Sequence, residues 1–199
     1  MKEVIVATKN EGKVREFRAL LDTFGIRCTS LRDVKLHNVT IEETGETFRE
    51  NALIKAETIA KAKGIPVLAD DSGLVVDALG GKPGVYSARY AGSDATDEEN
   101  NEKLLRHLEG VPEEKRSARF VCAIAFVIPG NEPIFTEGTC EGTIAEQIVG
   151  TGGFGYDPLF IPRGYDKTMA ELGEAEKNNI SHRFHALKQL EAILKRDER

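Results

Sequence analysis

Cysteine is scarce in this chain of 199 residues, and its three cysteines fit neither a disulfide framework nor a metal site. Cys28, Cys122 and Cys140 are odd in number and widely spaced, and none has a CxxC or histidine partner at ligand spacing. Long apolar runs are also missing, since the longest, at residues 120–129, is too short to cross a bilayer. No apolar leader precedes the first strand-like run. We therefore expect a protein of the reducing cytoplasm with no membrane partner.

The chain also has fewer basic than acidic residues. The 27 Lys and Arg residues are outnumbered by 33 Asp and Glu residues, which gives a formal net charge of -6. This balance argues against a general attraction to nucleic acid polymers or anionic membranes. Any polyanion must therefore be bound by a local cluster of cations. Linkers, repeats and low-complexity tracts are absent too, so the length predicts one domain or two closely packed lobes.

Hydrophobic periodicity predicts alternating strands and helices. The strand-like runs lie at residues 4–7, 26–31, 65–68, 118–128 and 134–140, and helical spacing covers residues 14–24, 46–63, 96–108 and 180–194. Residues 142–149 could add another strand. The Pro- and Gly-containing segment 129–133 indicates an antiparallel hairpin. Parallel-type strand–helix units together with a hairpin predict an α/β fold with a mixed sheet.

Two adjacent carboxylates, Asp70 and Asp71, follow the apolar run at residues 65–68, and Ser72 comes next. We interpret this pattern as a buried strand that ends in acid. Buried carboxylates need a cation, backbone amides or water. Hard oxygen ligands beside a turn suit Mg²⁺ that also meets phosphate oxygens. The sequence therefore predicts a magnesium site here.

A second acidic segment, with Glu42 and Glu43, precedes the helix that starts near Thr47. Acids before a helix are favourable through the helix dipole, so a structural role alone explains any one of them. Considered together with Asp70 and Asp71, they indicate a metal site. One acid from each of two loops is enough to hold Mg²⁺ while waters and substrate oxygens complete its coordination.

The turn between the first strand and the first helix predicts an anion site. Exposed backbone amides and the positive helix end favour an anion there, and Lys13 adds full charge. Gly12 allows close backbone approach, while Thr8 and Asn10 can hydrogen-bond phosphate oxygens or cap the helix. The alternative is a well-capped helix with a solvated lysine.

The segment 150–155 formally matches the G-x-G-x-x-G dinucleotide fingerprint. We reject that interpretation because the fingerprint needs a following helix, whereas two prolines follow here. An aromatic loop is the better functional interpretation, in which Phe154 stacks on a nucleobase and Asp157 reaches polar base or sugar atoms. The alternative is a Gly-rich surface turn with Phe154 in the core.

Donors gather where the last helix is expected to start. They are Lys177, Asn178, Ser181, His182 and Arg183. Such a cluster at the positive end of a helix predicts an anion or carbonyl site. The alternative is a capping serine with a surface arginine and a structural histidine.

Taken together and in order, the motifs closely resemble the inosine triphosphate pyrophosphatase family, which hydrolyses non-standard purine nucleoside triphosphates. They are T-K-N-E-G-K, E-E-T-G-E-T-F-R-E-N-A, A-D-D-S-G-L, P-G-V-Y-S-A-R-Y-A-G, G-T-G-G-F-G-Y-D-P-L-F and E-K-N-N-I-S-H-R, and they run from Thr8 to Arg183. The resemblance implies one domain over residues 1–199, with two lobes around a long mixed sheet flanked by helices and a central cleft. It also implies a homodimer, a Mg²⁺ cofactor and release of pyrophosphate.

The resemblance also assigns roles to residues by position. Glu43 and Asp71 correspond to metal ligands, and Asp71 and Lys13 to catalytic residues, with Asp71 as the general base. The remaining positions correspond to substrate contacts: Thr8, Lys9, Asn10, Glu11, Gly12, Lys13, Ser72, Phe154, Gly155, Tyr156, Asp157, Lys177, His182 and Arg183.

These assignments predict a pyrophosphatase that converts the triphosphates of inosine, deoxyinosine and xanthosine to monophosphates and so cleanses the nucleotide pool. Water activated by Asp71 attacks the α-phosphorus, while Lys13 neutralises developing charge. A carboxylate bound to Mg²⁺ is a poorer base, so Asp70 or Glu43 could share that role. Donors from His182 or Arg183 would favour the carbonyl that hypoxanthine and xanthine carry where adenine carries an amino group.

Two alternatives stay open. A nucleotide-binding regulator without turnover would keep the anion sites but would need no metal carboxylates. A septum-formation-type nucleotide pyrophosphatase, which is a related enzyme, would prefer modified pyrimidines.

Overall fold

The computed structural model describes residues 3–197, and the chain divides into two compact units. The first unit contains Met1–Asp71, Cys122–Gly138 and Arg183–Arg199, and the second contains Ser72–Val121 and Thr139–His182. Each unit is therefore built from segments that are distant in the sequence.

Six strands form a mixed sheet in the order β2-β1-β3-β4-β5-β6. Their bounds are β1 Glu3–Val6, β2 Arg27–Ser30, β3 Val67–Val76, β4 Ser117–Val127, β5 Ile134–Ile144 and β6 Phe160–Pro162. Strand β1 pairs in parallel with both β2 and β3, whereas β5 and β6 are antiparallel. Strands β4 and β5 are neighbours joined by residues 128–133, a link too short for a parallel crossover. The predicted α/β fold with a mixed sheet flanked by helices is confirmed.

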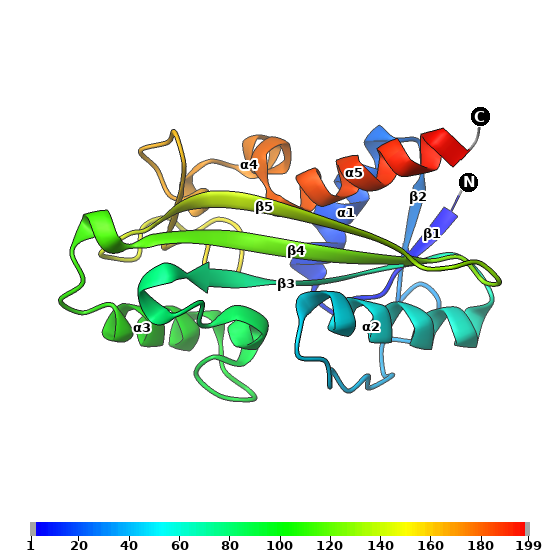
Figure 1. The fold of residues 1–199 in the computed structure, drawn as a ribbon, viewed down its shortest axis with the longest axis horizontal. Coiled ribbons are helices and arrows are strands. Elements are labelled where there is room, and N and C mark those ends of the chain that lie inside the picture. The colour runs from blue at the N-terminus through cyan, green and yellow to red at the C-terminus, as the bar shows by residue number, and fades with distance from the viewer. Residues whose placement is uncertain (1–2, 198–199) are drawn as a thin grey trace. The chain divides into compact units, whose positions relative to one another are not determined.

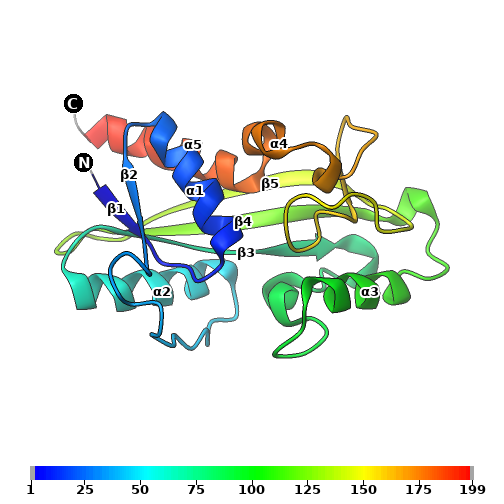
Figure 2. The same cartoon turned by 180° about the vertical axis from the view of Figure 1, so that it is seen from behind.

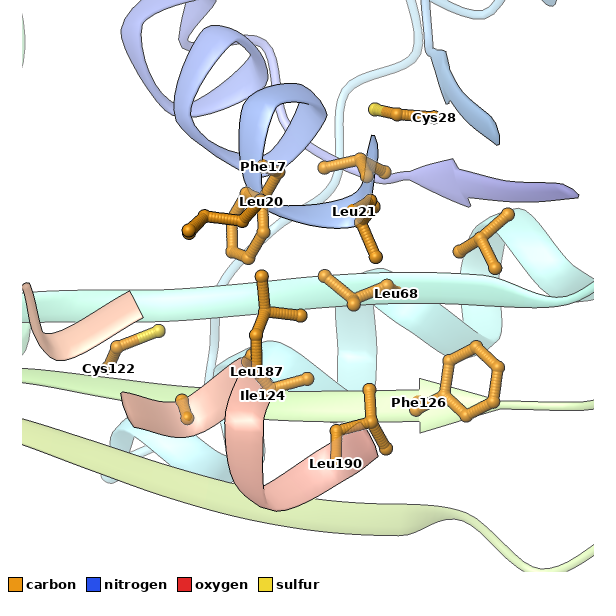
Figure 3. Close-up of a cluster of buried hydrophobic side chains, with 13 residues drawn as sticks. Phe17, Leu20, Leu21, Cys28, Leu68, Cys122, Ile124, Phe126, Leu187 and Leu190 are labelled. Atoms are coloured by element: carbon orange, nitrogen blue, oxygen red, sulfur yellow. The ribbon is translucent and has the colours of Figure 1, made fainter. Parts of the chain in front are cut away.

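In the first unit, α1 (Glu11–Thr23) and α5 (His182–Asp197) cover one face of the sheet, and α2 (Phe48–Lys63) covers the other (Figures 1 and 2). Alternation along β1 explains this arrangement. Val4 and Val6 pack with α1 and α5, while Ile5 packs with α2. Figure 3 shows the first of these clusters, with side chains from α1, the strands and α5.

The second unit has its own core. Helix α3 (Asp97–His107) contributes Leu104, and the far part of β3 contributes Leu74 and Val76. Both pack in one cluster with Phe120 and Phe160. The remaining helical segments are α4 (Glu174–Ile180) and the short 3₁₀ helices η1 Asp77–Leu79, η2 Gly84–Arg89, η3 Glu113–Lys115 and η4 Met169–Glu171.

The structure corrects three boundaries. Strand β3 continues to Val76, so Asp70 and Asp71 lie inside a ten-residue strand and do not end one. Residues 142–144 belong to β5, so the segment 142–149 forms no separate strand. The predicted helix 180–194 is two helices separated by Ser181, whose extended backbone ends α4. Apolar spacing alone could not reveal this break, because it continues across Ser181 at helical intervals.

Candidate active site

The two adjacent aspartates of β3 point to opposite faces of the sheet. Successive side chains of a strand alternate between faces. Asp70 contacts Lys13 of α1, on the face that α1 and α5 cover, and Asp71 contacts Asn51 of α2 on the other face. Both aspartates are buried. They therefore serve two different clusters and do not form one chelating pair, so Asp70 does not face the Asp71 cluster.

The Asp70 cluster balances two cations with two carboxylates. Lys13 Nζ lies 2.9 Å from Asp70 Oδ2, and Arg183 Nε lies 3.7 Å from the same oxygen. Arg183 Nη1 also donates to Glu16 Oε2 at 2.8 Å. Lys13 and Glu16 are three residues apart, so they share one face of α1. The interpretation of Lys13 as a solvated lysine is wrong, since its side chain is only 15% exposed.

Glu16 was not predicted from the sequence. It is buried next to Phe17 in α1, a position that apolar residues normally hold. A buried glutamate needs a cationic partner, but this burial is evident only from the structure, so the sequence carries no signal for the pair.

The Asp71 cluster joins β3, α2 and the acidic segment before α2. Asn51 donates from Nδ2 to Asp71 Oδ2 at 3.2 Å and accepts from Gly45 N at 2.8 Å. Lys55 Nζ lies 2.8 Å from Glu43 Oε1 and 3.5 Å from Asp71 Oδ1. Sequence reasoning missed both Asn51 and Lys55. Their signal was the four-residue spacing, which places both on one face of α2 directly after the acidic segment.

Burial and charge set the protonation of this cluster. Burial raises the pKa of Asp71 above its ordinary value, although the nearby Lys55 and Lys13 oppose the shift. Burial acts to lower the pKa of Lys55, but the carboxylates of Asp71, Asp70 and Glu43 outweigh it and raise that pKa. Lys55 therefore stays protonated at neutral pH, and its ammonium contacts Glu43 and Asp71 together.

These contacts test whether the residues fit Mg²⁺. Glu43 and Asp71 supply hard carboxylate oxygens that already approach one shared cation, the Lys55 ammonium. No group of three or more His, Cys, Asp or Glu that could hold a metal occurs within residues 3–197. Two carboxylates suit Mg²⁺, which keeps waters and takes substrate oxygens. The donor set therefore fits a magnesium ion shared with a phosphate substrate.

Residues 8–10 form a loop, and residues 11–13 begin α1. Asn10 caps α1, since its Oδ1 accepts from Lys13 N at 3.1 Å, and Asn10 N donates to Thr8 Oγ1 at 3.2 Å. Lys9 and Glu11 are exposed, and Glu11 forms an ion pair with Arg32. The predicted capping is thus present, and the start of α1 still offers the positive end of a helix dipole.

Close packing explains the glycines at positions 152 and 153. A Cβ on Gly152 would lie 2.6 Å from Ala170 O, and one on Gly153 would lie 2.0 Å from Asp157 Oδ2. No helix follows this segment, because turns lead directly to β6. The rejection of a dinucleotide fingerprint is therefore confirmed.

A third cluster surrounds Phe154, whose side chain is partly exposed. Lys177 Nζ donates to Asp157 Oδ2 at 2.6 Å, and both side chains are buried. The same oxygen accepts from Phe154 N at 3.0 Å, and Lys177 Nζ lies 4.4 Å from the centre of the Phe154 ring. Lys177, predicted in a different cluster from Phe154 and Asp157, thus meets both within the second unit.

The other predicted residues of the second unit are held by different contacts. His182 stacks on the Phe120 ring, with centroids 5.0 Å apart. Tyr156 donates its hydroxyl to Ser87 O at 2.7 Å, and burial raises the pKa of Tyr156. Ser72 follows Asp71 in β3 and is half-buried. Asn178 lies in α4 and Ser181 at its end.

A mixed sheet with helices on both faces, and with buried ion-pair clusters on both sides of β3, defines an α/β protein with charged groups at a central strand. Residues 4–193 match the model of the Ham1 family. The chain belongs to the Ham1 family, as its motifs predicted.

Several known proteins are similar to this chain over nearly its whole length. A dITP/XTP pyrophosphatase of Bacillus licheniformis is 61% identical over 98% of this chain and 98% of that protein. The dITP/XTP pyrophosphatase of Bacillus subtilis is 55% identical over the same shares. Among solved structures, the Staphylococcus aureus Ham1 protein has a TM-score of 0.85 at 43% identity, covering 98% of this chain and all 100% of its own. A HAM1 protein from Coxiella burnetii has a TM-score of 0.86 at 44% identity, with the same coverage.

One further observation concerns membranes. Among the helices of the described part of the chain, none is long and apolar enough to cross a bilayer.

Proposed function

We propose that this chain is a pyrophosphatase that hydrolyses the triphosphates of inosine, deoxyinosine and xanthosine to the monophosphate and pyrophosphate. Its close relatives from Bacillus licheniformis and Bacillus subtilis are named dITP/XTP pyrophosphatases, which supports this substrate class. The observation that carries the proposal is the pair of clusters on β3, where Asp71 shares Lys55 with Glu43 while Asp70 holds Lys13 and Arg183. Lysine ammonium groups such as those of Lys13 and Lys55 can bind the negative phosphates of a triphosphate. A carboxylate such as that of Asp71 can take the proton from the attacking water.

The triphosphate would bind at residues 8–13. Lys13 presents its ammonium from the first turn of α1, where backbone amides and the helix dipole also favour phosphate oxygens. Lys55, in the Asp71 cluster on the other face of β3, would add a second cation if its ammonium exchanged a carboxylate partner for a phosphate oxygen. Both lysines would stabilise charge that builds up on the phosphates as the bond breaks.

We assign Mg²⁺ to Glu43 and Asp71 as cofactor. When bound, it would neutralise phosphate charge and orient the phosphate group for attack at the α-phosphorus. The fit of the two carboxylates to one cation supports this assignment.

Asp71 would act as the general base. Burial raises the pKa of the Asp71 carboxylate, which favours proton acceptance, whereas Mg²⁺ bound to the same carboxylate would lower that pKa. Asn51 holds Oδ2 and leaves Oδ1 toward Lys55 and Glu43. The water loses a proton to the base and forms a bond to the α-phosphorus, and the bond from this phosphorus to the α–β bridging oxygen breaks. Pyrophosphate leaves with that oxygen. Glu43, on the same face of β3, is the carboxylate that could share the role.

The nucleoside would be contacted by Ser72, Phe154, Gly155, Tyr156, Asp157, Lys177, His182 and Arg183. Phe154 offers an aromatic face for stacking, and Lys177 and Asp157 supply polar groups beside it. Donors that face the 6-carbonyl of hypoxanthine would meet a donor in adenine and be left unpaired, which disfavours ATP. On the family resemblance alone, we also propose one two-lobed domain, a homodimer and a cytoplasmic location.

The test compares inosine triphosphate with ATP, GTP and a modified pyrimidine triphosphate, with and without Mg²⁺, and measures pyrophosphate release. The wild-type protein should prefer inosine triphosphate and require Mg²⁺. Asp71→Asn should lower kcat at least about 100-fold, because the general base is lost, while nucleotide binding persists. The matched control is Asp166→Asn, in an exposed loop, which should keep full activity.

Two results would contradict the proposal. Nucleotide binding without turnover by the wild-type protein would indicate a regulator. Preference for the modified pyrimidine would indicate a septum-formation-type enzyme.

A further inference from the structure

Helix α3 grips the backbone of Gly155 from both sides of the residue. Gly155 N donates to Asp97 Oδ2 at 2.7 Å, and Asn101 Nδ2 donates to Gly155 O at 2.9 Å. Gly155 itself has φ +62°, a conformation that only glycine adopts at no steric cost. The two side chains therefore clamp a glycine, the residue type with the most backbone freedom.

The clamp is rigid because Asp97 and Asn101 are themselves held in place by the start of α3. Asp97 and Asn101 are four residues apart on α3, and Asn101 Nδ2 also donates to Asp97 O at 2.8 Å. Asn101 is buried, at 3% exposure. The start of α3 is fixed by a capping box between Thr96 and Glu99. The side chains that hold Gly155 thus stand on a well-formed helix end.

The clamp also fixes the backbone of the preceding residue, Phe154. The N–H of Phe154 is held by Asp157 Oδ2 at 3.0 Å, and the next N–H, that of Gly155, is held by Asp97. These N–H groups belong to the two peptide planes that flank the Phe154 Cα, so the carboxylates fix both backbone dihedrals of Phe154. Those dihedrals fix the direction of the Phe154 Cα–Cβ bond and restrict the rotamers that its ring can adopt.

We propose that Asp97 and Asn101 are positioning residues that hold Phe154 ready to stack on the nucleobase. This inference rests on the proposed function, in which Phe154 contacts the base. Orienting the ring before binding removes the entropy cost of ordering the loop when the nucleotide arrives. The clamp therefore acts on nucleotide affinity more than on the chemical step.

The kinetic test uses Asp97→Ala and Asn101→Asp in the full chain. Asn101→Asp keeps the side-chain size but turns the donor into an acceptor that faces two carbonyls. Both variants should raise KM for inosine triphosphate roughly tenfold and change kcat less than about threefold, because binding is lost and not transition-state contact. Asp97→Asn keeps an oxygen acceptor for Gly155 N and should restore most of the affinity. Glu98→Ala, which removes a neighbouring exposed acid of the same helix turn, is the matched control and should resemble the wild type.

Two readouts separate positioning from a general loss of structure. Inorganic triphosphate carries no base, so its inhibition constant should stay unchanged in Asp97→Ala. The chain contains no tryptophan, so Phe154→Trp introduces a single fluorescent reporter into the loop. Without nucleotide, fluorescence anisotropy of this reporter should fall when Asp97→Ala is added and stay constant when Glu98→Ala is added.

The outcomes distinguish the inference from the proposed function. A wild-type protein that does not hydrolyse inosine triphosphate would contradict the function, while the anisotropy would still report whether α3 orders residue 154. Turnover by the wild type with an unchanged KM in both Asp97→Ala and Asn101→Asp would overturn the inference. An equal weakening of inorganic triphosphate, or an equal effect of Glu98→Ala, would overturn it as well.

Discussion

At the residue scale, the main feature is that the neighbouring aspartates Asp70 and Asp71 contact different groups of side chains. Side chains alternate between the two faces of β3. Asp70 therefore contacts Lys13 and Arg183 on one face. Asp71 contacts Asn51 and Lys55 on the other. One buried strand can thereby carry two charges without leaving either unpaired. The acid and the cations that the proposed chemistry needs are stabilised by the fold before any substrate binds.

Glu16 should matter for stability far more than other acids of its helix. Its partner Arg183 is 3% exposed, so Glu16→Ala leaves a buried guanidinium without this carboxylate. We expect the free energy of unfolding to fall by about 3 kcal/mol. Glu11→Ala removes an exposed ion pair from the same helix and should cost less than about 1 kcal/mol. Urea denaturation of both variants measures the difference, and equal losses would contradict the buried pairing.

Gly153 should tolerate no side chain. Its Cβ would lie 2.0 Å from Asp157 Oδ2, so Gly153→Ala must displace the carboxylate that holds Lys177 and Phe154 N. We expect KM for inosine triphosphate to rise at least about tenfold.

The control for this substitution is Gly110→Ala. Gly110 also has a left-handed backbone, with φ +77°, but a Cβ there meets nothing within 4 Å. It should therefore lower stability through backbone strain and leave KM unchanged. A similar rise in KM for both variants would show that strain, and not the displaced carboxylate, is responsible.

At the scale of elements, α2 is held at its start by a capping box. Thr47 accepts from Glu50 N, and the Glu50 side chain accepts from Thr47 N. Thr47→Ala should lower the free energy of unfolding by about 1 kcal/mol. Thr58→Ala removes a hydroxyl from the exposed middle of α2 and should change it by less than about 0.5 kcal/mol. Thermal or urea unfolding of the two variants tests this, and equal effects would argue against the cap.

A salt-bridge network ties η1 to β4 and β5. Arg119 donates to both oxygens of Asp77 at 3.1 Å, and its Nε donates to Glu141 at 3.0 Å. Hydrogen bonds from Arg119 and Ser117 lower the pKa of Asp77 below its ordinary value. A lowered folded-state pKa means that the stabilisation is complete above the unfolded pKa of about 3.9 and is lost as pH falls through the folded value.

The resulting prediction concerns Asp77→Asn. Its destabilisation relative to the wild type should be largest near neutral pH and should shrink as pH falls below about 4. The measurement is urea unfolding at several pH values. Asp166→Asn, in an exposed loop, should show no such trend, and a deficit for Asp77→Asn that persists at low pH would contradict the assignment.

At the scale of the whole molecule, sequence reasoning predicted what local signals determine. The helix predicted over residues 46–63 is α2 (Phe48–Lys63), which Thr47 caps at its start and Gly64, with its left-handed backbone, ends. Motif order predicted the family, and Phe154, Asp157 and Lys177 do meet.

Long-range contacts were not predictable in the same way. Glu16 and Arg183 are 167 positions apart, so no local pattern links them. The opposite orientation of Asp70 and Asp71 requires that β3 continue past them, which depends on the neighbouring strands in the sheet. Asn101 and Gly155 likewise meet only because the second unit folds. Such contacts arise from tertiary packing, and propensity carries no information on them.

The central claim is that water attacks the α-phosphorus of a non-standard purine triphosphate. Turnover of inosine triphosphate in water labelled with a heavy oxygen isotope, followed by mass analysis of the products, tests it most directly. The account predicts labelled inosine monophosphate and unlabelled pyrophosphate. Label in the pyrophosphate, or release of inosine diphosphate with inorganic phosphate, would contradict it.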